Sequence, residues 1–167
     1  MKRVYIMSAS CFLCSVVLSQ GNVMIGRTQM NLGVGLSEFG TPVYIGMDYG
    51  ANRSLSIGGE LSFRSYNEYW GQYNYRRSIT GIAANANYHF NTVLLIPSVY
   101  DFYAGLNLGF YNWSSPDSRY YGNHSSGLGL GAQIGGRYYF TRKFGVNLEF
   151  GGGNAFSGGK FGLTFKL

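Results

Sequence analysis

Apolar and polar residues alternate one by one through most of this 167-residue chain, in stretches separated by turn-forming residues. In the stretch 102–111, every second residue is Phe, Ala or Leu, and the residues between them are Tyr, Gly or Asn. Successive side chains of a β-strand point to opposite faces, so this alternation predicts strands with one apolar and one polar face. The fold must therefore give the two faces different surroundings.

Eight such stretches follow the first 19 residues, and turn-forming residues lie between them. No stretch after residue 19 approaches the run of about 18 apolar residues that a membrane-spanning helix needs. The predicted strands are 29–36, 43–50, 54–66, 78–90, 99–111, 126–140, 144–151 and 160–167.

Charged residues make up 12% of the chain, about half the quarter usual in a soluble domain. A closed barrel suits this composition, because its apolar face meets lipid and its polar face fills a narrow interior. The sequence predicts an all-β fold, an eight-stranded antiparallel up-and-down transmembrane β-barrel in the cell outer membrane. A soluble lipocalin-like barrel with its apolar face around a ligand is the alternative all-β fold.

The lengths of the connections and the positions of the aromatic residues predict which end of the barrel faces the periplasm. Short turns at 51–53 and 141–143 contrast with long polar-aromatic loops at 67–77 and 112–125, as periplasmic turns contrast with extracellular loops. The apolar segment 92–96 either extends the fourth strand or dips into the membrane interface. Girdles of aromatic residues are expected at both ends of the apolar face, the periplasmic one formed by Tyr49, Tyr88, Phe90, Phe102, Tyr138, Phe140, Phe144 and Phe165.

The N-terminus has the layout of a secretory signal peptide. Lys2 and Arg3 precede an uncharged, mostly apolar stretch at 4–18, and cleavage is expected after Ser19. We expect residues 1–19 to be the signal peptide and residues 20–167 to be the barrel domain. Cys11 and Cys14 lie inside the signal, so the mature chain is expected to contain no thiol for a disulfide or a metal site.

Three segments carry a resemblance to a known family: 135–149 (GGRYYFTRKFGVNLE), 101–109 (DFYAGLNLG) and the C-terminal GLTFKL. They resemble the penultimate hairpin, the fifth strand and the C-terminal assembly signal of small outer-membrane barrels of the OmpX/OmpA type, in the form found in Bacteroidetes-like outer-membrane β-barrel families. The resemblance implies a fold and assembly by the general barrel machinery, and it implies no activity. The chain ends in Leu167, where many such proteins end in an aromatic residue.

Several charged and polar residues fall on the inward face of the predicted strands. Folding the sixth and seventh strands together puts Arg137 opposite Asn147 and diagonal to Glu149, within reach of an ion pair. We favour a salt-bridged interior over an ion-selective pore, because eight strands enclose just enough space for side chains. The predicted lumenal network is Asp48, Glu60, Arg64, Arg137, Asn147, Glu149 and Lys160.

Two aromatic-basic clusters fall in the predicted extracellular loops. Arg and aromatic residues are enriched in binding hot spots, and the Arg fork matches phosphates. These clusters either contact lipopolysaccharide phosphates or a cell-surface ligand, or extend the outer aromatic girdle. The candidates are Tyr69, Trp70, Tyr73, Arg76 and Arg77 in one loop, and Trp113, Arg119 and Tyr120 in the other.

Catalysis has one candidate in the sequence. His124 and Ser126 resemble, by their spacing, part of the triad of the outer-membrane lipid A deacylase. Gly127 replaces that family's Asn, and no acidic residue follows, so we predict no enzyme. His89 has no second His nearby and is expected to hydrogen-bond in the lumen near the periplasmic rim. No metal, no cofactor and no nucleic acid is expected; outer-membrane lipid, lipopolysaccharide and the barrel-assembly machinery are the expected partners.

Overall fold

The computed structural model describes residues 25–37, 40–70, 73–114, 126–154 and 157–167, without the side chains of 68–75. The predicted signal peptide, 1–19, lies outside these residues. Eight strands follow one another, as predicted: β1 Thr28–Ser37, β2 Val43–Gly50, β3 Leu55–Trp70, β4 Tyr73–His89, β5 Tyr100–Ser114, β6 Gly127–Tyr139, β7 Phe144–Gly153 and β8 Gly158–Lys166. Within the described ranges, no helix is long and apolar enough to cross a membrane.

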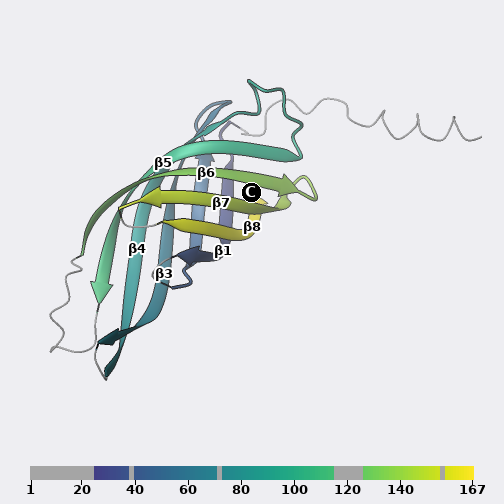
Figure 1. Cartoon of the computed structure of the whole chain (residues 1–167). Helices are drawn as coiled ribbons and strands as arrows, with labels where there is room; N and C mark the ends of the chain where they lie inside the picture. Colours follow the sequence, from purple (N-terminus) through teal and green to yellow (C-terminus); the bar gives the residue numbers. More distant parts are fainter. Residues whose placement is uncertain (1–24, 38–39, 71–72, 115–125, 155–156) are drawn as a thin grey trace, which may run out of the picture.

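The strands form one closed antiparallel barrel, in which each strand pairs with the next and β1 pairs with β8 (Figure 1). In the closing pair, Met30 lies opposite Phe165 and Leu32 opposite Leu163. A closed sheet leaves no strand edge with unpaired N–H and C=O groups, which is the condition for strands to cross the hydrocarbon layer. The predicted fold class is confirmed.

The two faces of the barrel are the inverse of those in a soluble protein. Large apolar side chains point outward, where Leu106 is 68% exposed and Leu128 is 73% exposed. Polar side chains fill the interior, where Thr164 and Asn87 are almost fully buried. The alternative of a soluble barrel with an apolar lumen is therefore wrong.

We name the two ends of the barrel by what they hold. The turn end holds the start of β1, the end of β8 and the connections 51–54, 90–99 and 140–143. The hairpin end holds the other four connections. Seven of the eight residues predicted for the aromatic girdle at this end, all but Tyr49, belong to a nearly continuous row of ring contacts, and Tyr100, which was not predicted, joins them. The ring centroids of neighbours in this row are 5.1–6.3 Å apart, and its members are Tyr88, Phe90, Tyr100, Phe102, Tyr138, Phe140, Phe144 and Phe165.

The apolar segment 92–96 forms a turn beyond β4 and does not extend that strand. The amide of Leu94 donates to the carbonyl of Phe90 at 2.9 Å, and the amide of Ile96 donates to the carbonyl of Asn91 at 3.0 Å. Leu95 has a φ of 53° and is 88% exposed, and Val93 and Leu94 are each 63% exposed. The turn therefore presents three apolar side chains at the level of the aromatic girdle.

The predicted loop 67–77 is wrong, because strand pairing continues through most of it. Tyr66 pairs with Arg77, and the ladder runs on to Trp70 opposite Tyr73, with only residues 71–72 between β3 and β4. The predicted loop 112–125 likewise begins as strand, since β5 continues to Ser114. Aromatic residues favour β-strands both inside and outside the lipid bilayer. The polar and aromatic composition of residues 67–77 was therefore not sufficient to predict a loop. Figure 1 shows the hairpin of β3 and β4 reaching well past the other strands at the hairpin end, and β5 follows β4 as far as Ser114, opposite Ser78.

Candidate functional site

The lumen at the turn end is organised around one buried guanidinium. Arg137, on β6, is 4% exposed and bonds to Asp48 of β2 at 2.6 Å and to Asp101 of β5 at 3.0 Å. Asn31 donates a further hydrogen bond to Asp48 at 2.9 Å. Paired charges of this kind avoid the cost of an isolated buried ion. The cluster ties together strands from opposite sides of the barrel.

A second ion cluster lies nearer the hairpin end. Lys160 of β8 contacts Glu60 of β3 at 2.7 Å and Glu149 of β7 at 3.2 Å. Tyr103 donates a hydrogen bond to Glu149 at 2.8 Å. Here too, two carboxylates share one cation.

Amide side chains connect the interior between these clusters. Gln133 donates to Asn87 at 2.8 Å, and Asn107 donates to Gln133 at 3.0 Å. Asn147 donates to the hydroxyl of Tyr44 at 2.8 Å. These bonds satisfy most of the amide groups named here in a space where an unpaired polar group is costly, although Oδ1 of Asn147 accepts no hydrogen bond from the described residues. Together with the ion clusters, they fill the cross-section of the barrel.

The structure places the predicted lumenal residues inside the barrel but changes the predicted pairing. Arg137 lies opposite Asn147 in the register, as expected, yet its ion pairs go to Asp48 and Asp101, not to Glu149. Glu149 lies directly opposite Lys160, which takes it as a partner. The pairing was wrong because a long side chain in a narrow barrel reaches across the lumen as easily as along the sheet.

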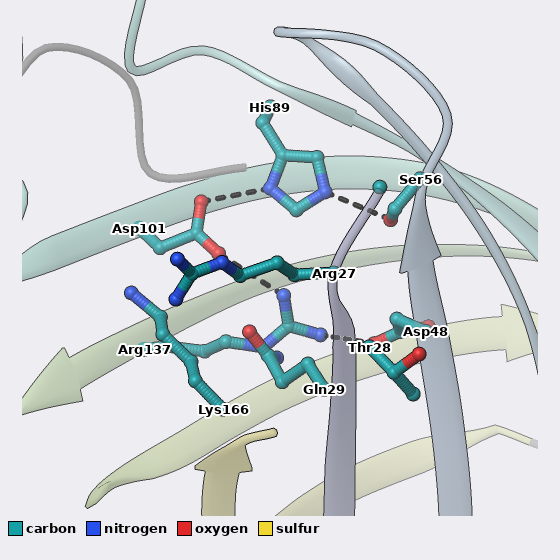
Figure 2. Close-up of a pocket in the computed structure, with 10 residues that line it drawn as sticks. Arg27, Thr28, Gln29, Asp48, Ser56, His89, Asp101, Arg137 and Lys166 are labelled. Atoms are coloured by element: carbon teal, nitrogen blue, oxygen red, sulfur yellow. Dashed lines mark hydrogen bonds and ion pairs between the residues drawn. The ribbon is translucent and has the colours of Figure 1, made fainter. Parts of the chain in front are cut away.

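A further hydrogen-bonded row of side chains lies beside Arg137 (Figure 2). Ser56, the second residue of β3, lies 2.9 Å from Nε2 of His89, the last residue of β4. Nδ1 of His89 lies 2.8 Å from Asp101, the second residue of β5. His89 was expected in the lumen near this rim, but Ser56 and Asp101 were missed. The alternation placed Tyr103 inward, and the same period places Asp101 inward as well.

Three small cavities lie along the lumen. The one at the turn end has Arg27, Ser56, His89, Arg137 and Lys166 in its lining and holds about 30 Å³. Cavities of about 10 and 30 Å³ follow toward the hairpin end. Each holds a few water molecules at most. Within the described ranges, no group of three His, Cys, Asp or Glu side chains gathers as a metal site.

At the hairpin end, the structure brings the two predicted clusters together. Trp113 of β5 lies opposite Ile79 of β4, and the guanidinium of Arg77 lies 5.5 Å from the centre of its ring. Tyr66 of β3 makes an edge contact with Trp113, at 6.5 Å between ring centres. Arg77 is therefore buried and part of the packing, whereas Arg76 is exposed.

The other hairpin-end candidates lie partly outside the described residues. Arg119 and Tyr120 fall in 115–125, and the side chains of Tyr69, Trp70 and Tyr73 fall in 68–75. Their backbones show that the last three belong to strands β3 and β4 and not to a loop. His124 also lies outside, whereas the Ser126 hydroxyl donates to Asn112 at 2.9 Å.

Comparisons with known proteins show a shared fold. No family model and no curated protein sequence matches the chain. The outer membrane protein OprG of Pseudomonas aeruginosa is 10% identical, with a TM-score of 0.67 over 89% of this chain and 98% of that one. The N-terminal β-barrel domain of Pseudomonas aeruginosa OprF is 18% identical, with a TM-score of 0.61 over 86% and 98%.

The outer membrane protein Ail of Yersinia pestis, solved in a phospholipid bilayer nanodisc, shares the same fold. It is 11% identical, with a TM-score of 0.55 over 85% of this chain and 99% of Ail. Ail, the attachment invasion locus protein, has also been solved in complex with the heparin analogue sucrose octasulfate. Identities this low establish the fold and nothing more.

Proposed function

We propose that this chain, which has the fold of the small outer-membrane barrels, is an outer-membrane protein that binds an anionic saccharide through its protruding strands. The outward apolar face and the girdle at the turn end suit a lipid bilayer, with aromatic rings at the interface. We place the turn end in the periplasm, because both ends of the barrel domain lie there and the longer strands lie opposite. We also propose assembly by the general barrel machinery, which the C-terminal segment GLTFKL supports.

The unequal length of the strands is the observation that carries this proposal. Val43, at the start of β2, pairs with Phe63, whereas β3 continues to Trp70. At about 3.4 Å per residue, the segment 64–70 reaches roughly 24 Å farther along the strand than β2 does. A strand needs no such length to span the membrane, so the extension of β3, β4 and β5 forms a platform above it.

The side chains of this platform suit an anionic partner. Arg76 is exposed, and the packed group of Tyr66, Arg77 and Trp113 forms a rigid base beside it. Arg pairs well with phosphate and sulfate groups. The phosphates of lipopolysaccharide and the sulfates of a host glycan share this chemistry, and the structural neighbour Ail binds a sulfated heparin analogue.

A shortened hairpin tests the proposal. Replacing residues 66–77 by Asn-Gly removes Tyr66, Arg76 and Arg77, leaves Ser65 and Ser78 paired and closes the hairpin with a favoured two-residue turn. We expect the shortened barrel, in nanodiscs, to lose binding to immobilised heparin, to lipopolysaccharide micelles, or to both, measured by surface plasmon resonance. The probe that the intact barrel prefers identifies the source of the anion. Equal binding by the shortened and intact barrels would show that the platform is no binding surface.

A single substitution gives the matched comparison. Arg76→Ala removes one exposed charge at the hairpin end, and we expect about two- to fivefold weaker binding, the range of one exposed ion pair. Arg53→Ala removes an equally exposed charge at the turn end and serves as the control. An identical effect of the two variants would mean that net charge, and not the platform, determines binding.

A further inference from the structure

Three buried oxygen atoms in the middle of the lumen accept no hydrogen bond from any residue that the structure describes. They are Oδ1 of Asp48 on β2, Oδ1 of Asn85 on β4 and Oδ1 of Asn147 on β7. The side chains of Asp48 and Asn147 are almost fully buried, at 5% and 4% exposure. A buried acceptor without a partner is costly, so these oxygens call for a guest that carries positive charge or donates hydrogen bonds.

Two of these oxygens converge on Gly58. Asp48 lies opposite Gly58 in the pairing of β2 with β3, and Asn85 lies opposite Gly58 in the pairing of β3 with β4. A Cβ atom at Gly58 would collide with both Oδ1 atoms, since each lies within 2.5 Å of the position it would take. The two oxygens are therefore at most about 5 Å apart, the separation of two ligands on opposite sides of one Ca²⁺ at about 2.3–2.6 Å.

The side chains that carry these oxygens line one cavity with room for a single ion. The cavity holds about 10 Å³, and its lining includes Asp48, Asn85 and Asn147 together with Glu60 and Glu149. This is close to the least space that holds one water molecule. Ca²⁺ lies closer to its oxygen ligands than a hydrogen-bonded water does, so the ion fits where a larger guest is excluded.

The charges around the cavity favour a cation over water. Oδ2 of Asp48 accepts hydrogen bonds from Arg137 (Figure 2) and from Asn31, which leaves Oδ1 for a second cation. The two ion clusters beside the cavity hold only two permanent cations, Arg137 and Lys160, for four carboxylates, Asp48, Asp101, Glu60 and Glu149. Arg27 and Lys166 belong to the lining of the turn-end cavity and not to this one. Because a buried excess of negative charge is costly, a divalent cation is the guest that balances it.

We propose that the lumen binds one Ca²⁺ ion between Asp48 and Asn85, with Asn147 as a further ligand. Carboxylate and amide oxygens are hard ligands of the type that Ca²⁺ prefers, and Ca²⁺ accepts irregular geometry where Mg²⁺ requires a near-ideal octahedron. One carboxylate and two amides make up the set, which distinguishes it from clusters of His, Cys, Asp and Glu. The ion joins β2, β4 and β7, and this site is independent of the saccharide binding proposed for the hairpin end.

The ion is enclosed when the barrel closes. The cavity lies between the two ion clusters, because Asp48 and Arg137 of one cluster and Glu60 and Glu149 of the other belong to its lining. Bound Ca²⁺ can therefore leave or enter a folded barrel only slowly, whereas refolding from urea gives the ion free access to its ligands. Calcium present during folding is retained, and calcium added afterwards is not.

Calcium retention by the full-length barrel tests the site. The barrel is refolded from urea into detergent with Ca²⁺, passed over a chelating resin and analysed for metal by mass spectrometry. We expect one Ca²⁺ per barrel, and far less when Ca²⁺ is added only after folding in EDTA. Asn85→Leu removes one ligand at unchanged charge and should weaken binding by at least about 10-fold, the lower range for disrupting a metal site.

Asn107→Leu is the matched control. Asn107 lies opposite Asn85 in the next strand, is buried to a similar degree and is outside the lining of this cavity, so this variant should retain Ca²⁺ like the parent. The shift of the unboiled band on a denaturing gel verifies that each variant is folded, and Asn85→Ala replaces Asn85→Leu if the larger side chain prevents folding. Refolding in Ca²⁺ instead of EDTA should also raise the urea midpoint of the parent but not that of Asn85→Leu.

Three results would overturn the proposal. A folded parent that retains no Ca²⁺ would show that water satisfies the three oxygens. Retention that Asn85→Leu shares in full would assign the ion to the exposed surface of the barrel. Retention of Mg²⁺ in place of Ca²⁺, when both are present during refolding, would overturn the choice of ion.

Discussion

Arg137 is the residue on which two buried carboxylates depend. It is the shared partner of Asp48 and Asp101, and all three side chains are at least 95% buried. Arg137→Met keeps much of the volume but leaves both carboxylates without a counter-charge. We expect a loss of about 3–5 kcal/mol in the free energy of unfolding, the usual cost of breaking a buried pair on one side. Urea titration of the barrel in lipid vesicles, followed by tryptophan fluorescence, measures it.

Arg142→Met is the matched control, because Arg142 is exposed in the turn between β6 and β7. An exposed substitution of this kind shifts stability by about 0.5 kcal/mol or less. If Arg137→Met unfolded at the same urea concentration as Arg142→Met, the buried cluster would contribute nothing to stability.

At the residue scale, alternation predicted which side chains point inward but not which ones meet. Arg64, Glu60 and Lys160 follow from the strand period alone. The partners of Arg137 do not, because Asp48 lies 89 positions away in sequence and on a strand that is not adjacent. Such contacts depend on the diameter of the closed barrel and on the rotamer of a long side chain. The row of Ser56, His89 and Asp101 was missed for a similar reason, since it joins three strands.

The sequence left open whether the apolar segment 92–96 extends the fourth strand or contacts the membrane interface, and the structure shows that it forms a turn. Val93, Leu94 and Leu95 are exposed at the level of the aromatic girdle, so we expect their side chains to enter the lipid interface. Residues 20–167, the expected mature chain, contain no cysteine. Leu95→Cys, labelled with an environment-sensitive fluorophore in bilayers, should therefore report one position. We expect blue-shifted emission that brominated lipids quench.

Arg142→Cys provides the comparison from a neighbouring turn at the same end, with a polar residue in place of an apolar one. Its label should emit as in water and resist quenching. Similar quenching at both positions would mean that the turns share one depth, and the apolar segment 92–96 would then have no special contact with lipid.

The strands were predictable from the sequence where they cross the lipid bilayer. Between the aromatic girdles, one face must be apolar, and there the predicted and observed strands agree; β2, for example, spans Val43–Gly50 in both. Beyond the membrane this constraint ends. The continuation of β3 through Tyr66 to Trp70 has no apolar alternation, so its pairing with β4 was not visible in the pattern.

Over the whole molecule, the polar contacts divide the lumen into separate small spaces. The cavities of about 30, 10 and 30 Å³ lie on either side of the Arg137 and Lys160 clusters. A hydrated ion needs a continuous path, and breaking either cluster to make one would leave buried charges unpaired. We therefore expect the barrel in planar bilayers to show no lasting open state. A steady conductance in the parent would contradict the closed lumen and favour the alternative of a narrow pore.

The variant Lys160→Ala tests whether the ion cluster around Lys160 keeps the lumen closed. It removes the cation that Glu60 and Glu149 share and shortens a side chain that fills the lumen. The two carboxylates then repel each other and admit water between the cavities. We expect brief, cation-selective openings in this variant, seen as reversal potentials that follow the cation gradient. Arg53→Ala, at the exposed turn, should stay as silent as the parent. Equal silence in Lys160→Ala would show that the amide contacts around Gln133 close the lumen without the ion cluster.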